Sequence, residues 1–329
     1  MTDDQGPAPP TPPVRPGWPA SSPPRPVSGG TRTSGLGEIV DAIIRLYRRR
    51  GRLLLGICAA FEVPVFAVSA LLGARLITAM TRLLGFWPLD PPTTLPDSYP
   101  PFDVALVADL MASFAGLIVV AMVAGAMTTA ALALAISEVG VGRPTTVLGS
   151  LGPTLRRVPA LLLSQVLYLC AIAVVLIGGT LIVSVPIGLA PDPASGGFLV
   201  FAGIVAFVGV LAITAFLSLR LGFWPQIVAL EGKTGIAAMR RSWQVVAGST
   251  WRVLGYLVVL GLADYTLALV LSQLGGIALD MAAPARGAAV ALHVAWNVAV
   301  TVIVAPIVPV GMTLLFFELR RRHGEAPVR

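Results

Sequence analysis

Four polar residues lie inside long apolar segments, where a polar side chain is costly and therefore informative. Glu62 and Asp264 are each near the middle of an apolar run, and His293 is followed one helical turn later by Asn297. A central Asp costs roughly 2.5–3.5 kcal/mol to insert into a bilayer, so we expect such residues to face the interior of a helix bundle. Two interpretations stay open: a site for a cation, a proton or a polar headgroup, or hydrogen bonding between helices.

Residue types that carry out catalysis or bind metals are scarce. The histidines are His293 and His323, and the cysteines, Cys58 and Cys170, both fall within apolar runs. The sequence contains no CxxC, GxSxG or HExxH motif and no glycine-rich dinucleotide turn. We therefore expect no enzymatic activity, no metal site and no cofactor.

A second group of candidate residues belongs to the arginine-rich segment 36–52, LGEIVDAIIRLYRRRGR. Its polar residues recur at spacings of three and four with apolar residues between them, which predicts an amphipathic helix. Such a helix with arginines on its polar face lies in the plane of the lipid headgroups, and Gly51 is placed to end it in the left-handed conformation. The residues predicted to bind anionic headgroups here are Arg45, Arg48, Arg49 and Arg52.

The same design recurs later in the chain. The segment GKTGIAAMRRSWQVVAGSTWR carries Arg240 and Arg241 on its polar face, with Gly248 at the position of Gly51. A weaker copy, GRPTTVLGSLGPTLRRVPALLL, precedes another apolar run. The copies begin near residues 36, 143 and 235, which predicts three repeats, each an in-plane helix followed by a transmembrane hairpin.

The amino-acid composition indicates that the long apolar segments cross a membrane. The 329 residues are 56% hydrophobic and 12% charged, with a mean hydropathy of +0.85, whereas soluble domains carry about 25% charged residues. This predicts an all-α integral membrane protein with six transmembrane helices, at about 53–74, 104–136, 159–189, 198–219, 253–275 and 288–317.

The basic residues predict the orientation of these spans. The N-terminus, the even-numbered loops and the C-terminus hold 20 of the 23 bases, and the opposite side holds only Arg75, Arg82 and Arg286. The positive-inside rule then places both termini in the cytoplasm of a bacterial cytoplasmic membrane. Because the bases sit beside apolar spans, we expect anionic lipid headgroups rather than nucleic acid as their partner.

The ends of the chain differ from the middle. Residues 1–35 contain ten prolines together with Ser, Thr and Gly, a composition that predicts a disordered cytoplasmic tail. Residues 36–319 form the predicted membrane domain, and residues 320–329 form a short basic cytoplasmic tail.

Three segments carry a resemblance to a known family. GLGEIVDAIIRLYRR, the RRSW…WRVLG block and the closing FFELRRR resemble the membrane domain of glycerophosphoryl diester phosphodiesterase and related actinobacterial six-span proteins. Phe316, Phe317, Glu318, Leu319 and Arg320 stand where that family commonly has a Tyr-Tyr-Asp-Leu-Arg-like motif. The family's hydrolytic reaction belongs to a separate soluble barrel, so the resemblance implies a membrane domain without chemistry of its own.

Two functions follow from these observations. The first is a non-catalytic membrane module that organises lipid or partner proteins through its cytoplasmic in-plane helices. The alternative is a transporter or channel for a small or lipid-like substrate, which would use Glu62 and Asp264. The scarcity of polar groups in the spans favours the first.

Overall fold

The computed structural model describes residues 35–85, 104–188, 193–282 and 286–325, and within these ranges the chain is helical and contains no strand. Residues 1–34 of the predicted N-terminal tail and residues 326–329 of the predicted basic tail lie outside these ranges. The helices are α1 (Leu36–Gly85), α2 (Val104–Gly140), α3 (Val147–Arg156), α4 (Val158–Gly188), α5 (Pro193–Leu221), α6 (Trp224–Glu231), α7 (Gly235–Val246), α8 (Thr250–Ala282), α9 (Arg286–Val304) and α10 (Ile307–Arg322).

Six stretches of the described chain are long and apolar enough to cross a membrane, as the hydropathy pattern predicts. Apart from α4, which matches its predicted span to within one residue, the long helices extend beyond the predicted spans. At 37 residues, α2 is roughly 55 Å long at 1.5 Å per residue, against a hydrocarbon core of about 30 Å. The last stretch is divided into α9 and α10, because Pro306 has no N–H to continue the helical hydrogen bonds.

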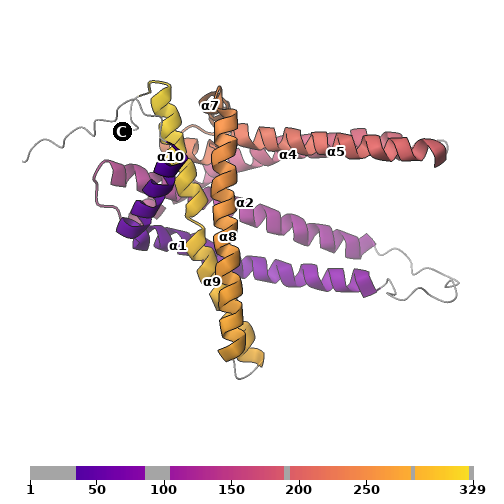
Figure 1. Ribbon diagram of the computed structural model, residues 1–329, viewed down its shortest axis with the longest axis horizontal. Helices are drawn as coiled ribbons and strands as arrows, with labels where there is room; N and C mark the ends of the chain where they lie inside the picture. Colours follow the sequence, from indigo (N-terminus) through magenta and orange to yellow (C-terminus); the bar gives the residue numbers. More distant parts are fainter. Residues whose placement is uncertain (1–34, 86–103, 189–192, 283–285, 326–329) are drawn as a thin grey trace, which may run out of the picture.

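The long helices pack in three neighbouring pairs, α1 with α2, α4 with α5, and α8 with α9. In Figure 1 the pairs meet at the end where α7 and α10 lie and diverge away from it, the α8–α9 pair running in a different direction from the α4–α5 pair. Large apolar side chains on the diverging parts are exposed, among them Val174, Ile182, Phe201 and Leu274. This surface requires an apolar solvent, which a bilayer supplies.

The core lies where the pairs meet. Phe223, Ile227 and Phe316 are fully buried there, together with Leu54 of α1 and Leu132 of α2. The rings of Phe223 and Phe316 have their centroids 6.0 Å apart, within the range of favourable aromatic contacts. The short helix α6 is therefore part of the core rather than a surface connection.

The predicted left-handed cap at Gly51 is wrong. The helical geometry of α1 is interrupted one residue earlier, at Arg50, where φ is −134° and ψ is 24°. A negative φ is accessible to any residue, so this bend needs no glycine. Gly248, the equivalent position after α7, does adopt a positive φ of 77°.

Two serines join α7 to the long helices. The Ser242 hydroxyl donates to the Arg220 carbonyl over 2.8 Å and accepts from the Phe223 N–H over 3.2 Å. At the start of α7, the Gly235 N–H donates to the Ser164 hydroxyl over 2.9 Å. These bonds satisfy backbone groups that the ends of α5 and α7 leave unpaired.

Candidate functional site

The predicted buried polar residues make different contacts. The Thr128 hydroxyl of α2 donates to the Glu62 carboxylate over 3.4 Å, whereas Asp264 is partly buried on α8 and makes no hydrogen bond with the described residues. The imidazole of His293 lies 3.3 Å from the carboxylate of Asp280. The Asn297 amide donates to the carbonyl of His293 in its own helix, over 2.8 Å.

These contacts are the ordinary ways in which polar groups are satisfied inside a helical membrane protein. A hydroxyl–carboxylate bond joins two neighbouring helices, and an amide that bonds the preceding turn satisfies itself locally. The arrangement therefore resembles interhelical hydrogen bonding more than a shared binding site.

The predicted headgroup residues on the first part of α1 face outward. Arg45, Arg48, Arg49 and Arg52 are exposed, and Arg45 pairs with Asp41 over 3.5 Å. On the other side of the same helix Ile39 and Ile43 are buried, with 5% and 7% of their surface exposed. The first part of α1 therefore packs against the rest of the protein through its buried isoleucines and exposes a row of guanidinium groups on its other side.

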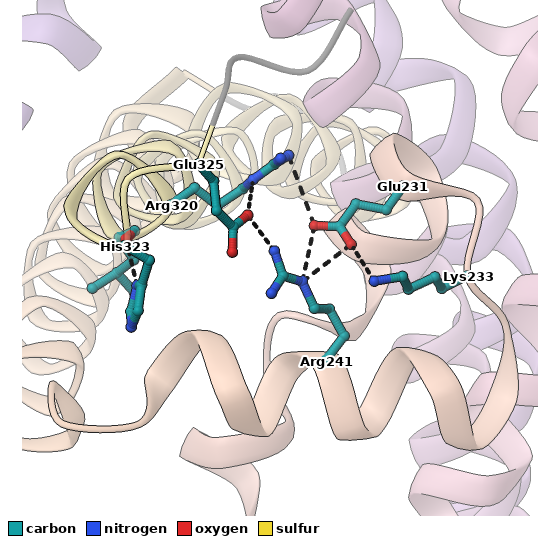
Figure 2. A network of polar contacts seen from close by, with 7 residues as sticks. Glu231, Lys233, Arg241, Arg320, His323 and Glu325 are labelled. Carbon is teal, nitrogen blue, oxygen red and sulfur yellow. Dashed lines mark hydrogen bonds and ion pairs between the residues drawn. The ribbon is translucent and has the colours of Figure 1, made fainter.

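The two headgroup residues predicted on α7 differ in their surroundings. Arg240 is exposed, but Arg241 has only 17% of its side chain exposed and pairs with Glu231 and Glu325. Figure 2 shows Glu231 lying among three cationic side chains. We name the group the ion cluster; its members are Glu231, Lys233, Arg241, Arg320 and Glu325.

The ion cluster joins three helices and the segment that follows the last one. Glu231, at the end of α6, lies 3.0 Å from Lys233, 3.2 Å from Arg241 of α7 and 3.7 Å from Arg320 of α10. Arg320 also lies 2.9 Å from Glu325, which contacts Arg241 as well. Alternating charges held in this way are satisfied by one another rather than by solvent.

The electrostatics of the cluster follow from these contacts. Burial acts to lower the pKa of Arg241, but the hydrogen bonds and charges of Glu325 and Glu231 outweigh it and raise that pKa. Burial likewise acts to raise the pKa of Glu325, and the hydrogen bonds and charges of Arg241 and Arg320 lower it overall. Both groups are therefore firmly charged near neutral pH.

Glu318, the acidic residue of the FFELRRR segment, pairs with arginines at the end of its own helix, α10. The Glu318 carboxylate lies 2.6 Å from Arg321 and 3.1 Å from Arg322 and is itself 8% exposed. Arg321 and Arg322 therefore form ion pairs within α10. The third consecutive arginine, Arg320, belongs to the ion cluster.

Neither α6 nor the role of Glu231 is among the predictions made from the sequence. The signals were present: Pro225 in the first turn of α6 and Gly232 after its last residue, with a φ of 68°, are the usual start and end of a helix. Its position beside Arg240 on a polar helix face predicts that Arg241 binds lipid headgroups. Its partners Glu231 and Glu325 come from other parts of the fold.

Comparison with known proteins identifies the family of the chain. Neither the curated proteins nor the solved structures include a match to this chain. A family model covers residues 36–319, from the start of α1 into the last turn of α10. The chain belongs to the family described as a domain of unknown function (DUF7847).

Proposed function

We propose that the protein is a non-catalytic module of the bacterial cytoplasmic membrane that organises anionic lipid, and through it partner proteins, with in-plane cytoplasmic helices. The observation that carries the proposal is the first part of α1. Four exposed arginines, Arg45, Arg48, Arg49 and Arg52, project from it, while Ile39 and Ile43 are buried. Such a helix suits the headgroup layer.

The proposed arrangement has three transmembrane hairpins, each preceded by an in-plane helix. The contacts of α1 with α2, α4 with α5, and α8 with α9 support the hairpins. The first part of α1, α3 and α7 supply the in-plane helices, and the bend at Arg50 separates the first of them from its span. The resemblance to the phosphodiesterase membrane domain belongs to the same proposal.

The proposed orientation places both termini in the cytoplasm, and it rests on the 20 of 23 bases found on one side of the spans. It is tested by labelling single cysteines from outside intact cells. Cysteines near Asp97 should react and cysteines near Lys233 should not. The reverse labelling pattern would show that the first part of α1 lies on the outer face of the membrane, and it would contradict the proposed function.

Charge sets the expected strength of lipid binding. A surface base near an anionic bilayer contributes about 1 kcal/mol, and salt screens this contribution over a Debye length of about 10 Å at 0.1 M. Selectivity for anionic lipid should therefore depend on the number of exposed arginines and fall as salt rises.

The experiment compares spin-labelled phosphatidylglycerol with spin-labelled phosphatidylcholine around the full-length protein in bilayers. Replacing Arg45, Arg48, Arg49 and Arg52 together by Gln should remove most of the preference for phosphatidylglycerol. Replacing Arg75 and Arg82, which are also exposed but belong to the opposite side, is the control and should leave the preference intact. Equal losses in the two variants would contradict the proposal.

The transport alternative requires Glu62 and Asp264 to act on one substrate. Glu62 contacts Thr128 of α2 and Asp264 lies on α8, and among the described residues no hydrogen bond or ion pair joins the two carboxylates. The module function therefore accounts for more of the described contacts.

A further inference from the structure

A pocket lies where the three helix pairs meet. Its volume is about 430 Å³, and α2, α4, α5, α6, α8 and α10 all contribute to its walls. The walls are chiefly apolar, with Met122, Leu219, Leu254, Leu257, Val308 and Met312 among them. Sites for small molecules typically range over about 300–1,000 Å³ and combine apolar walls with a few placed polar groups.

Two glutamines supply polar groups to this interhelical pocket. Gln165 of α4 and Gln226 of α6 line it and are 3% and 1% exposed. The Nε2 atom of Gln165 and the Oε1 atom of Gln226 are fully buried and have no hydrogen-bond partner among the described residues. Buried polar atoms without partners are rare in folded proteins, and each one calls for an explanation.

The chemistry of the two amides limits the ligand. Each terminal amide carries a donor and an acceptor, and rotation of the amide presents either one to the pocket. A hydroxyl group can accept from one amide and donate to the other. Thr129, Ser218 and Tyr168 add further hydroxyls to the described walls.

The pocket selects against charge. The described residues that line it include no Asp, Glu, Lys, Arg or His. An ionised headgroup would lose its hydration there without gaining a counter-ion. The surrounding apolar walls favour a hydrocarbon chain attached to the polar group.

We propose that the interhelical pocket binds a neutral, hydroxyl-bearing amphiphile of the diacylglycerol type, whose hydroxyl accepts from Gln165 and donates to Gln226. This site is distinct from the arginine surface of α1, which is charged and faces outward. Because all three helix pairs line the pocket, a bound ligand holds them together and stabilises the folded protein.

The test measures equilibrium binding of radiolabelled dioctanoylglycerol to the full-length protein in detergent micelles. Saturable binding is expected, with an accompanying rise in melting temperature. Gln165→Leu and Gln226→Leu should each weaken binding about fivefold, the loss of roughly one hydrogen bond. Gln244→Leu, on the exposed face of α7 and outside the pocket, is the matched control and should bind like the natural protein.

Folding of the variants does not obscure this result. Each glutamine buries one amide atom that has no partner among the described residues, so a leucine of similar size should be neutral or stabilising for the free protein, which its melting temperature will show. A further variant, Ala215→Phe, keeps both glutamines and fills the pocket from α5. It should abolish binding.

Competitors identify the group that is recognised. The O-methyl ether of dioctanoylglycerol cannot donate a hydrogen bond and should compete about fivefold less well, and raising the salt concentration should leave the affinity unchanged. Absence of saturable binding, full affinity in Ala215→Phe, or equal competition by the methyl ether would overturn the proposal. Equal competition by dioctanoylphosphatidylglycerol would also overturn it, by showing a site for acyl chains of any lipid.

Discussion

Replacing Glu231 by Gln should destabilise the protein far more than the same replacement at a solvent-exposed ion pair. The carboxylate of Glu231 is 11% exposed and lies 3.0 to 3.7 Å from three cations. Glutamine keeps the shape of the side chain but removes the charge. Arg241 and Arg320 then keep Glu325 as their carboxylate partner within the ion cluster.

The magnitude follows from exposure. Lys233 is 45% exposed, so its pair with Glu231 contributes little. Arg241 and Arg320 are 17% and 14% exposed, and hydrogen bonds to charged groups contribute about 1.5–3 kcal/mol. Removing one partner of a fully buried pair costs about 3–5 kcal/mol. Because Glu231 is nearly but not fully buried, we expect a loss of about 2–3 kcal/mol in the free energy of unfolding.

Asp41→Asn provides the matched control, because it also converts a carboxylate beside an arginine into an amide. Asp41 and Arg45 are 70% and 61% exposed, and an exposed pair four residues apart on a helix contributes about 0.2–0.5 kcal/mol. The assay is reversible unfolding in mixed micelles of a mild and a denaturing detergent, followed by circular dichroism.

The comparison between the two variants decides the outcome. Losses that differ by less than about 0.5 kcal/mol, the usual range for surface substitutions, would refute the view that the ion cluster holds α6, α7 and α10 together. A double-mutant cycle with Arg241→Gln measures how much of the loss belongs to that one pair.

Three other predictions concern separate parts of the molecule. The pKa of Glu325 is lowered by its arginine partners. The contribution of this carboxylate to stability should therefore be present above the ordinary carboxyl pKa and lost as the pH falls through the lowered pKa. The variant Glu325→Gln should remove this part of the acid dependence of the melting temperature. Gly275→Ala should lower the melting temperature, because the new methyl group meets the indole of Trp296, whereas Gly261→Ala on the same helix meets nothing within 4 Å and should not. Asp264→Asn should leave expression, stability and cellular function intact, and a folded but inactive variant would support a proton- or cation-coupled transporter instead.

Local sequence was enough to predict the helical membrane class, and it also contains the cause of the break in the last span. Hydropathy over about 20 residues reports whether a segment suits hydrocarbon, and this property does not depend on which other helices are nearby. Pro306 removes one hydrogen bond from the helical ladder, because its nitrogen carries no hydrogen. The exposed row from Arg45 to Arg52 is likewise visible as a period of three to four residues.

Tertiary structure decided which polar residues meet. Arg240 and Arg241 are adjacent and alike in sequence, yet one is exposed and the other pairs with Glu325, 84 residues away. Gln165 and Gln226 come together at one pocket from α4 and α6, although neither belongs to a motif. Helical periodicity predicts which residues share a face of one helix. It does not predict which face of another helix lies opposite, because that depends on how all the helices pack together.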